Sequence, residues 1–262
     1  MSEPSSHPLD GRVALVTGAS SGIGAALATA MAASGAEVVL VGRNANRLSA
    51  VVDSIRGRAG VAHAIVCDLD GEGAGATIAD QAVGAAGTVD ILVHVAGRFE
   101  TGAIDDGGVE SLDRQYATNV RAPYALTLAL LPQLRGGGVV LFISSIAAHV
   151  GFAGAAAYCA SKGAIAALVP ALAGELGPQG VRVNAIAPGE IDTPMTSPYY
   201  KECPRYLPTV IAMTPAGRVG SPRDVAGAAV FLASDAASFI HGATLVVDGG
   251  LTATLHIDGG SV

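Results

Sequence analysis

Tryptophan is absent from this chain of 262 residues, and aromatic residues make up only 4% of it. Charged residues are also scarce, at 14%, and 22 acidic against 15 basic residues give a formal net charge of −7. Because proteins that bind the phosphate backbone need a basic stripe, this composition argues against a nucleic-acid partner. Half of the residues are hydrophobic, which is enough to bury a core and excludes disorder as the main state.

Cysteine is rare too, and Cys67, Cys159 and Cys203 are widely spaced without a CxxC pair. This usage is typical of a reduced, cytoplasmic protein rather than of a disulfide framework. The polar start MSEPSSHPLD lacks the positive charge and the apolar stretch of a secretory signal. No uninterrupted apolar run reaches about 18 residues, so we expect neither a transmembrane helix nor a membrane partner.

What the chain does contain is an alternation of short apolar runs and longer helical stretches. The runs that predict strands are Arg12–Thr17, Glu37–Val41, Ala62–Cys67, Val89–Val95, Gly138–Ile143, Val181–Ile186 and Thr244–Val247. The predicted helices are Ile23–Ser34, Ala45–Arg56 after an N-cap at Asn44, Val109–Leu131, Ala156–Leu176, and Ser221-Pro222 to about Leu232. This order predicts an α/β fold with a doubly wound, Rossmann-type sheet of seven parallel strands and helices on both faces.

No change of composition marks a linker, so we expect one domain over residues 1–262. One segment, Thr193–Arg218, is too long and too rich in proline for a simple connection. We expect it to form a lid or substrate loop. The tail Leu251–Val262 receives no assignment, and Asp258-Gly259-Gly260 is expected to be a disordered end.

A glycine-rich turn, Thr17–Gly24, follows the first predicted strand and opens the first helix. Glycines in such a turn let the backbone approach a pyrophosphate, and the helix N-terminus offers free N–H groups. The spacing Gly-x-x-x-Gly-x-Gly differs from the common GxGxxG, and no Lys follows as in a Walker A loop. The candidate cofactor-binding residues here are Gly18, Ser20, Ser21, Gly22, Ile23 and Gly24.

The second predicted strand ends in Gly42-Arg43-Asn44, where a site for an unphosphorylated ribose usually has an acid. Arg43, with Asn44 beside it, suits a ribose 2′-phosphate and favours NADP over NAD. Asp68 and Leu69 follow the third strand and are placed to contact an adenine, although Asp68 is equally compatible with a plain loop or N-cap acid.

Tyr158 and Lys162 are four residues apart in a predicted helix and therefore share one face of it. A phenol that exchanges protons near pH 7 must ionise more easily than its reference pKa near 10 allows, and a nearby cation acts in that direction. Ser145 ends the fifth strand, thirteen residues before Tyr158. Asn119 lies inside a predicted helix, where Asn is a poor helix former, which indicates a buried hydrogen-bonding task or an irregular helix.

In combination, these motifs resemble the short-chain dehydrogenase/reductase family, in its group of single-domain enzymes of about 250 residues. The matching positions are Thr17–Gly24, Asp68, Ala96-Gly97, Asn119, Ser145, Tyr158-x-x-x-Lys162, Pro188-Gly189, Ile191, Thr193 and Asp248-Gly249-Gly250. The likeness extends from Gly11 to about Leu251 and implies hydride transfer between nicotinamide and a carbonyl or alcohol carbon.

The resemblance also implies roles for four residues. Tyr158 would be the general acid in reduction and the base in oxidation, and Lys162 would lower the Tyr158 pKa and hold the nicotinamide ribose. Ser145 would hydrogen-bond the substrate oxygen. Asn119 would support a water chain that returns the proton to Tyr158.

Further implied cofactor contacts are Ala96, Gly97, Pro188, Gly189, Ile191 and Thr193, of which Ile191 and Thr193 would fix the carboxamide. No metal is required, and the six His show no ligand spacing such as HExxH. A homotetramer is implied as well.

Three positions depart from the family pattern or stand out near it. His94-Val95-Ala96-Gly97 replaces Asn-Asn-Ala-Gly, which puts in doubt the hydrogen bonds that tie the strands together below the adenosine. His94 itself is expected to be a satisfied core histidine. Glu190 stands where an apolar residue is commoner and faces either solvent or the substrate pocket, and His149 is expected to be a solvent-exposed loop residue.

Several readings remain open. The leading one is a cytoplasmic NADP(H)-dependent carbonyl reductase or alcohol dehydrogenase, and the alternative within the family is an NAD(H)-dependent alcohol, polyol or steroid dehydrogenase. Its substrate is either a β-ketoacyl thioester, for which Arg98, Lys201, Arg205 and Arg218 are candidate carrier contacts, or a free sugar, steroid or secondary-metabolite ketone. A reading of another class is a catalytically idle dinucleotide sensor or scaffold.

Overall fold

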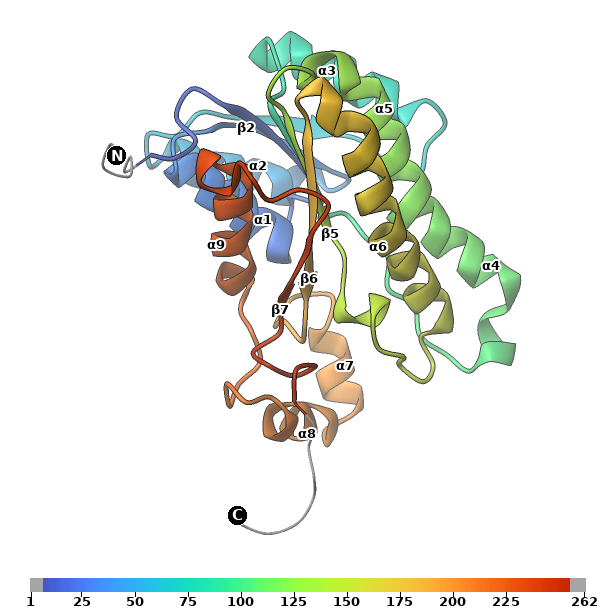
Figure 1. Cartoon of the computed structure of the whole chain (residues 1–262). Coiled ribbons are helices and arrows are strands. Elements are labelled where there is room, and N and C mark those ends of the chain that lie inside the picture. The colour runs from blue at the N-terminus through green and yellow to red at the C-terminus, as the bar shows by residue number, and fades with distance from the viewer. Residues whose placement is uncertain (1–6, 255–262) are drawn as a thin grey trace.

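The computed structural model describes residues 7–254, and the predicted disordered end Asp258-Gly259-Gly260 lies outside them. Seven parallel strands form one sheet in the order β3-β2-β1-β4-β5-β6-β7 (Figure 1). The strands are β1 (Val13–Thr17), β2 (Glu37–Gly42), β3 (Ala62–Val66), β4 (Ile91–His94), β5 (Val139–Ile143), β6 (Arg182–Pro188) and β7 (Thr244–Val247). The predicted doubly wound, parallel sheet is therefore confirmed.

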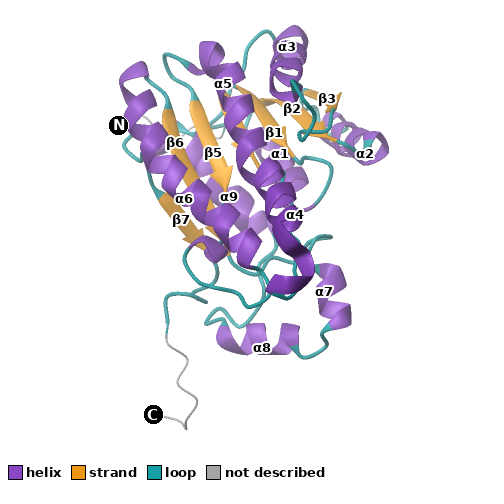
Figure 2. Ribbon diagram, turned by 90° about the vertical axis from the view of Figure 1, so that its right-hand side faces the viewer, coloured by secondary structure: helices purple, strands orange, loops and turns teal. Residues whose placement is uncertain are grey.

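Helices cover both faces of this sheet. The α-helices are α1 (Gly22–Ala33), α2 (Ala45–Arg56), α3 (Ala74–Ala86), α4 (Ile104–Tyr116), α5 (Ala122–Leu134), α6 (Ala156–Leu176), α7 (Ser197–Glu202), α8 (Tyr206–Met213) and α9 (Pro222–Ala233). Short 3-10 helices occur at η2 (Ile146–Ala148), η3 (Gly177–Gln179) and η4 (Asp235–Ala237). Figure 2 shows α4, α5 and α6 in front of the sheet and α1 and α9 behind it.

The core consists of two apolar layers, one on each face of the sheet. Strand β5 shows why: Val139, Leu141 and Ile143 belong to the layer with α1, α2 and α9, whereas Val140 and Phe142 belong to the layer with α3, α5 and α6. Successive side chains of a strand point to opposite faces, so a strand buried on both sides must be apolar at every position. That requirement accounts for the short, continuous apolar runs of the sequence.

The predicted helix Val109–Leu131 is wrong as a single element. It starts earlier, as α4, passes through a π-helix η1 (Ala117–Arg121) and continues as α5. Pro123 lies in the first turn of α5 and has no N–H to donate to the carbonyl four residues back, which is that of Asn119. The α-helical ladder is broken at that point, and a π-turn with bonds to the fifth residue takes its place.

Helix α6 has the predicted bounds and is the longest helix of the described residues. Within residues 7–254, Ala156–Gln179 is the one stretch long and apolar enough to pass as a membrane span, with a mean hydropathy of 1.4. Core helices of soluble proteins have the same composition, and α6 packs Ile165, Val169 and Leu172 into the core layer on its side of the sheet. This helix also carries Tyr158 and Lys162.

The segment Thr193–Arg218 contains α7 and α8, which lie beyond the carboxyl ends of β5, β6 and β7 (Figure 1). In open α/β sheets ligands bind at that edge. The predicted lid therefore stands next to the place where a ligand is expected, and we refer to α7, α8 and the turn between them as the lid.

Candidate active site

The turn between β1 and α1 requires its glycines. Gly18 and Gly22 have positive φ angles of 67° and 54°. A Cβ on Gly18 would lie 2.8 Å from the backbone of Ala96, and one on Gly24 would collide with the carbonyl of Gly18. Only glycine fits these positions of close backbone approach, and the phosphate cradle predicted at the N-terminus of α1 stays a prediction.

The same turn is tied to the end of β4. The hydroxyl of Thr17 accepts hydrogen bonds from the backbone N–H groups of Val95 at 3.0 Å and Ala96 at 3.2 Å. The segment His94–Gly97 lacks both Asn residues of the family pattern, and in this chain the Thr17 hydroxyl makes the hydrogen bonds that tie β1 to the end of β4.

His94 is the buried, satisfied core histidine that was expected. Its Nε2 lies 2.9 Å from the hydroxyl of Thr127, which itself donates to the carbonyl of Pro123, so Nε2 carries the proton. The ring stacks on Phe142 with 4.8 Å between centroids. Burial lowers the pKa of His94 to about 3.

The ends of β2 and β3 bring Arg43 next to the adenine-side residues. Asn44 caps α2 as predicted, since its Oδ1 accepts from the backbone of Arg47 at 2.9 Å. Arg43 is exposed, and Asp68 and Leu69 follow the neighbouring strand. A Cβ on Gly42 would lie 3.4 Å from the hydroxyl oxygen of Ser20, which places the glycine-rich turn beside this strand end. All of these predicted residues thus share one edge of the sheet.

Tyr158, Lys162 and Ser145 meet where β5 ends. Ser145 lies close enough to the Tyr158 phenol to affect its ionisation, and the ammonium of Lys162 lies 5.6 Å from the centre of the Tyr158 ring. Lys162 is 5% exposed and donates to the carbonyl of Ile143 at 2.9 Å. A Cβ on Gly97 would lie 3.8 Å from the Lys162 Nζ, so the turn after β4 reaches the same place.

Burial shifts the pKa values of Tyr158 and Lys162. Burial raises the pKa of Tyr158 to about 12, against the effect of the nearby Ser145 side chain, which lowers it. Burial also lowers the pKa of Lys162 to about 8. Burial disfavours the charged phenolate, which accounts for the raised pKa of Tyr158, and the lowering of that pKa by Lys162 stays a prediction.

Asn119 is buried in the π-helix and all of its side-chain groups are satisfied. Its Oδ1 accepts from the backbone N–H of Arg98 at 2.7 Å, and its Nδ2 donates to the Arg98 carbonyl and to Ser161, both at 2.9 Å. Ser161 in turn donates to the carbonyl of Tyr158 at 2.8 Å. Both predicted features, a buried hydrogen-bonding task and an irregular helix, are confirmed.

The segment after β6 closes the site from the other side. A Cβ on Gly189 would lie 2.6 Å from the Cβ of Asp248, so only glycine fits between these strand ends. Ile191 forms an isolated bridge to Gly220. Thr193 is 3.5 Å from the Cβ position of Gly22. Thr193 is thus brought to the glycine-rich turn, whereas Gly189 contacts Asp248 and Ile191 pairs with Gly220 on the same segment.

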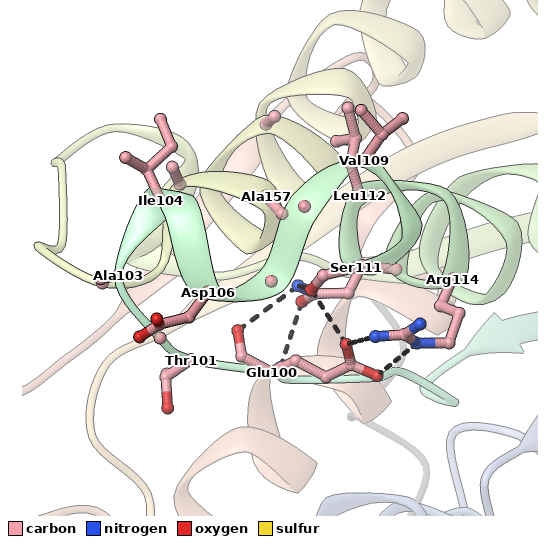
Figure 3. Close-up of a pocket in the computed structure, with 17 residues that line it drawn as sticks. Glu100, Thr101, Ala103, Ile104, Asp106, Val109, Ser111, Leu112, Arg114 and Ala157 are labelled. Atoms are coloured by element: carbon pink, nitrogen blue, oxygen red, sulfur yellow. Dashed lines mark hydrogen bonds and ion pairs between the residues drawn. The ribbon is translucent and has the colours of Figure 1, made fainter.

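A cavity of about 590 Å³ lies beside this site rather than at it (Figure 3). It runs between the start of α4 and the start of α6, and Ala157 lines it while Tyr158, Ser145 and Lys162 do not. Its floor is held by Glu100, which accepts from Arg114 and Ser111, both at 2.9 Å. The Arg114 hydrogen bond holds the pKa of Glu100 at about 2.

Sequence reasoning missed some residues of the site. Phe99 packs edge-on against Tyr158 with 4.8 Å between ring centroids. Ser161 links Asn119 to the Tyr158 backbone, and its place one residue before Lys162 was the available signal. Glu190 was noticed, but not that its two carboxylate oxygens accept from Tyr200 and Tyr206 of the lid. His149 is exposed, as expected.

Comparison with known proteins agrees with this geometry. The family model described as enoyl-(acyl carrier protein) reductase matches residues 18–252. D-threitol dehydrogenase of Mycolicibacterium smegmatis is 38% identical over 246 residues, covering 93% of this chain and 94% of that protein.

Two solved structures superpose closely. A Beutenbergia cavernae protein described as an NAD(P)-dependent gluconate 5-dehydrogenase holds NADP at low occupancy; it has a TM-score of 0.90 at 38% identity, over 95% of this chain and 100% of that one. A 7α-hydroxysteroid dehydrogenase complexed with NADH and 7-oxoglycochenodeoxycholic acid has the same TM-score and identity, over 95% and 98% of the chains. With the glycine-rich turn, the Tyr158–Lys162 pair and these matches in hand, the chain belongs to the short-chain dehydrogenase/reductase family of NAD(P)-dependent oxidoreductases.

Proposed function

We propose that this protein is an NADP(H)-dependent oxidoreductase that transfers a hydride between nicotinamide and a carbonyl or secondary alcohol carbon of a small molecule. The observation that carries the proposal is the meeting of Ser145, Tyr158 and Lys162 at the carboxyl ends of the strands, beside the glycine-rich turn. Relatives named as dehydrogenases of a polyol and of a steroid support the reaction class.

The residues of the turn fit a dinucleotide. The collisions that a Cβ would cause at Gly18 and Gly24 leave room only for backbone, and the α1 N-terminus presents N–H groups to a pyrophosphate. Arg43 is exposed beside Asn44 and would hold a 2′-phosphate, while Asp68 and Leu69 would border the adenine. When bound, the nicotinamide supplies or accepts the hydride.

The proton that the substrate oxygen gains or loses is transferred by side chains of the protein. Ser145 and Tyr158 are placed to donate hydrogen bonds to a substrate oxygen, which stabilises the charge that develops there. Because the pKa of Tyr158 is raised, the phenol carries its proton at neutral pH, and this is the form that a carbonyl reduction needs. Lys162 holds its charge near this group and next to Gly97, where it would bind the nicotinamide ribose.

Asn119 acts on this chemistry as a positioning residue. Its amide fixes the backbone of Arg98, directly after Ala96-Gly97, and through Ser161 it fixes the start of α6. Both N–H groups of the side chain are used, so a water at this position would donate either to the second lone pair of the Asn119 Oδ1 or to a backbone carbonyl of the π-helix.

We also propose a homotetramer in the cytoplasm, formed by one domain per chain. Exposed apolar side chains support the assembly on two sides of the molecule: Tyr116, Tyr124 and Leu128 on α4 and α5, and Phe231 and Phe239 at α9 and its end. Clusters of exposed large apolar residues are typical of protein interfaces.

A second candidate within the same class is NAD(H) dependence, which the NADH complex of the related steroid dehydrogenase favours. Parallel assays with NADPH and NADH on a panel of carbonyl compounds separate the two. We expect a preference for NADPH of about tenfold or more, since a charge-assisted hydrogen bond contributes about 1.5–3 kcal/mol. A tenfold preference for NADH would overturn the cofactor assignment.

Replacement of the acid tests the reaction itself. We expect Tyr158→Phe to lose a factor of about 100 to 10,000 in kcat, the usual contribution of general acid catalysis, with NADPH binding unchanged. Tyr124→Phe removes a phenol hydroxyl from α5 but keeps the apolar ring that the proposed interface uses, so it is the matched control and should keep full activity. Turnover that survives in Tyr158→Phe would refute the role, and an inactive wild type that binds NADPH would favour the idle sensor.

A further inference from the structure

Glu190 stands at the edge of the sheet where the chemistry is proposed. It follows β6 by two residues, as Ser145 follows β5 by two residues. These strands are neighbours, with Ile143 opposite Ile186, and adjacent strands lie about 4.8 Å apart. In this register Ser145 is level with Pro188, so Glu190 lies two residues beyond Ser145 at the same edge of the sheet, and the Glu190 charge is one of those that act on the Tyr158 phenol.

The lid fixes the carboxylate of Glu190 from the far side. Tyr200 donates to its Oε1 and Tyr206 to its Oε2, both at 2.7 Å. The Tyr206 ring packs against Tyr199 with 4.7 Å between centroids and against Tyr200 with 6.3 Å. Burial and the Glu190 carboxylate raise the pKa of both phenols, so each stays a hydrogen-bond donor.

The charge of Glu190 is held in place but is not neutralised. Its partners on the lid are neutral phenols, and no Arg or Lys of residues 7–254 forms an ion pair with it. An ionised carboxylate offers about four acceptor positions, and the phenols use two. The remaining positions can accept from hydroxyl groups and will repel an anion.

Two of the four basic residues that a carrier or an anionic substrate would need are already engaged. Arg98 lies 3.4 Å from Asp70 and 3.2 Å from Glu100, and Arg218 contacts both carboxylate oxygens of Asp224 at 2.9 Å. These pairs neutralise Arg98 and Arg218 within the protein. The other two, Lys201 and Arg205, are exposed on the lid, and neither forms an ion pair with Glu190 in residues 7–254.

We infer that Glu190 determines substrate specificity: it accepts a hydrogen bond from a second hydroxyl of a neutral polyhydroxylated substrate and disfavours substrates with an anionic group near the reacting carbon. This inference rests on the proposed oxidoreductase function and narrows its substrate class. The substrate is then a polyol or the corresponding ketose rather than a sugar acid or an acyl-carrier thioester.

The test compares three alcohols at saturating NADP⁺: a tetritol, the tetronate of the same carbon number, and a simple secondary alcohol. For the wild type we expect kcat/KM on the tetritol to exceed that on the tetronate about tenfold or more, the factor that a charge-assisted hydrogen bond supports. Glu190→Gln should lower kcat/KM on the tetritol about tenfold and so reduce the ratio of tetritol to tetronate kcat/KM. Its kcat/KM on the simple secondary alcohol should change less than about twofold.

Two further variants separate the effect of the Glu190 charge from the effect of the lid structure. Glu202→Gln makes the same change on the exposed face of the lid and should behave as the wild type. Tyr206→Phe removes one tether but keeps the carboxylate, so it should retain the preference for the tetritol even where the rate falls. Loss of the preference in Tyr206→Phe but not in Glu190→Gln would show that the lid, not the charge, selects the substrate, and would overturn the inference.

Failure of the inference is distinguishable from failure of the proposed function. Oxidation of the simple alcohol with no preference between tetritol and tetronate leaves the function standing and overturns the inference. Where none of the three alcohols is oxidised, the proposed function is in question. Calorimetric titration of the tetritol and of the tetronate into the NADP⁺ complex of Tyr158→Phe then decides the inference. Tetronate binding as tight as that of the tetritol, or no binding of either, overturns it; a tighter tetritol supports it.

Discussion

Replacement of Asn119 by Ala is expected to damage stability and activity together. The side chain is 2% exposed and makes three hydrogen bonds, at 2.7, 2.9 and 2.9 Å. At a net contribution of about 1 kcal/mol each, their loss costs about 3 kcal/mol. The backbone of Arg98 is half-buried, so water can reach part of what is left unpaired, and Ser161 keeps its bond to the Tyr158 carbonyl. For both reasons we expect the loss of stability in Asn119→Ala to stay near 3 kcal/mol, about 1 kcal/mol for each hydrogen bond.

A cost of this size is large against a typical total stability of about 5–15 kcal/mol. For a chain of this length, 1 kcal/mol lowers Tm by about 2–4 °C, so Asn119→Ala should melt roughly 6–12 °C below the wild type. We expect kcat/KM to fall more than about tenfold even at temperatures where the variant is fully folded, because displacements of about 1 Å cost about that much or more in rate. Scanning calorimetry and carbonyl-reduction kinetics measure the two effects.

Asn184→Ala is the matched control for the second effect. Asn184 is fully buried in β6, donates to the Ile240 carbonyl at 2.8 Å and accepts from the backbone of Ala243 at 3.0 Å. It should lose about 2 kcal/mol of stability and keep its activity at permissive temperature. If Asn119→Ala melts with the wild type, or if both variants lose activity equally, the hydrogen-bond network through Asn119 does not position the site.

Three shorter predictions follow from other residues. The pKa of His94 in the folded state, about 3, lies below that of the unfolded chain, so unfolding takes up a proton and stability falls as the pH drops from about 6.5 toward 3; unfolding free energies from urea titrations should fall about 1.4 kcal/mol per pH unit more steeply in the wild type than in His94→Gln. Gly24→Ala should weaken NADPH binding and lower Tm, because its Cβ meets the Gly18 carbonyl, whereas Gly84→Ala in open space on α3 should raise stability by about 0.5–1 kcal/mol. Arg43→Glu should weaken NADPH binding at least tenfold with NADH binding little changed, and equal losses for both cofactors would count against a 2′-phosphate contact.

Local spacing accounts for what could be predicted. Tyr158 and Lys162 share a face because four residues make about one helical turn, and this holds wherever the helix lies. The glycine-rich turn is similar, since only glycine tolerates the positive φ of Gly18 and its approach to Ala96. In both cases the geometry depends on residues close together in the chain, so the sequence was sufficient to predict it.

Properties that depend on distant packing were not predictable in the same way. The pKa of Tyr158 rises because several elements bury the phenol, and Lys162 gives a hydrogen bond to Ile143, nineteen residues away. The break of the predicted helix around Asn119 was visible only in part: the odd polar residue was noticed, but the absence of an N–H at Pro123 was not connected with it. Helix α3 (Ala74–Ala86), with two glycines and a mild periodicity, was not predicted.

Glu190 combines a feature that the local sequence shows with one that depends on distant packing. Its neighbours in the sequence left open whether it faces solvent or substrate, because the answer depends on Tyr200 and Tyr206, ten and sixteen residues further on, folding back over the strand end. The groups proposed to handle the proton and the hydride stand on strand ends and on α6, whose positions the sheet determines. The group proposed to choose the substrate is held by two short lid helices, which can change without disturbing the sheet. With these proposed roles, a change of substrate would come from altered residues in Thr193–Arg218 and at Glu190, while Ser145, Tyr158 and Lys162 stay as they are.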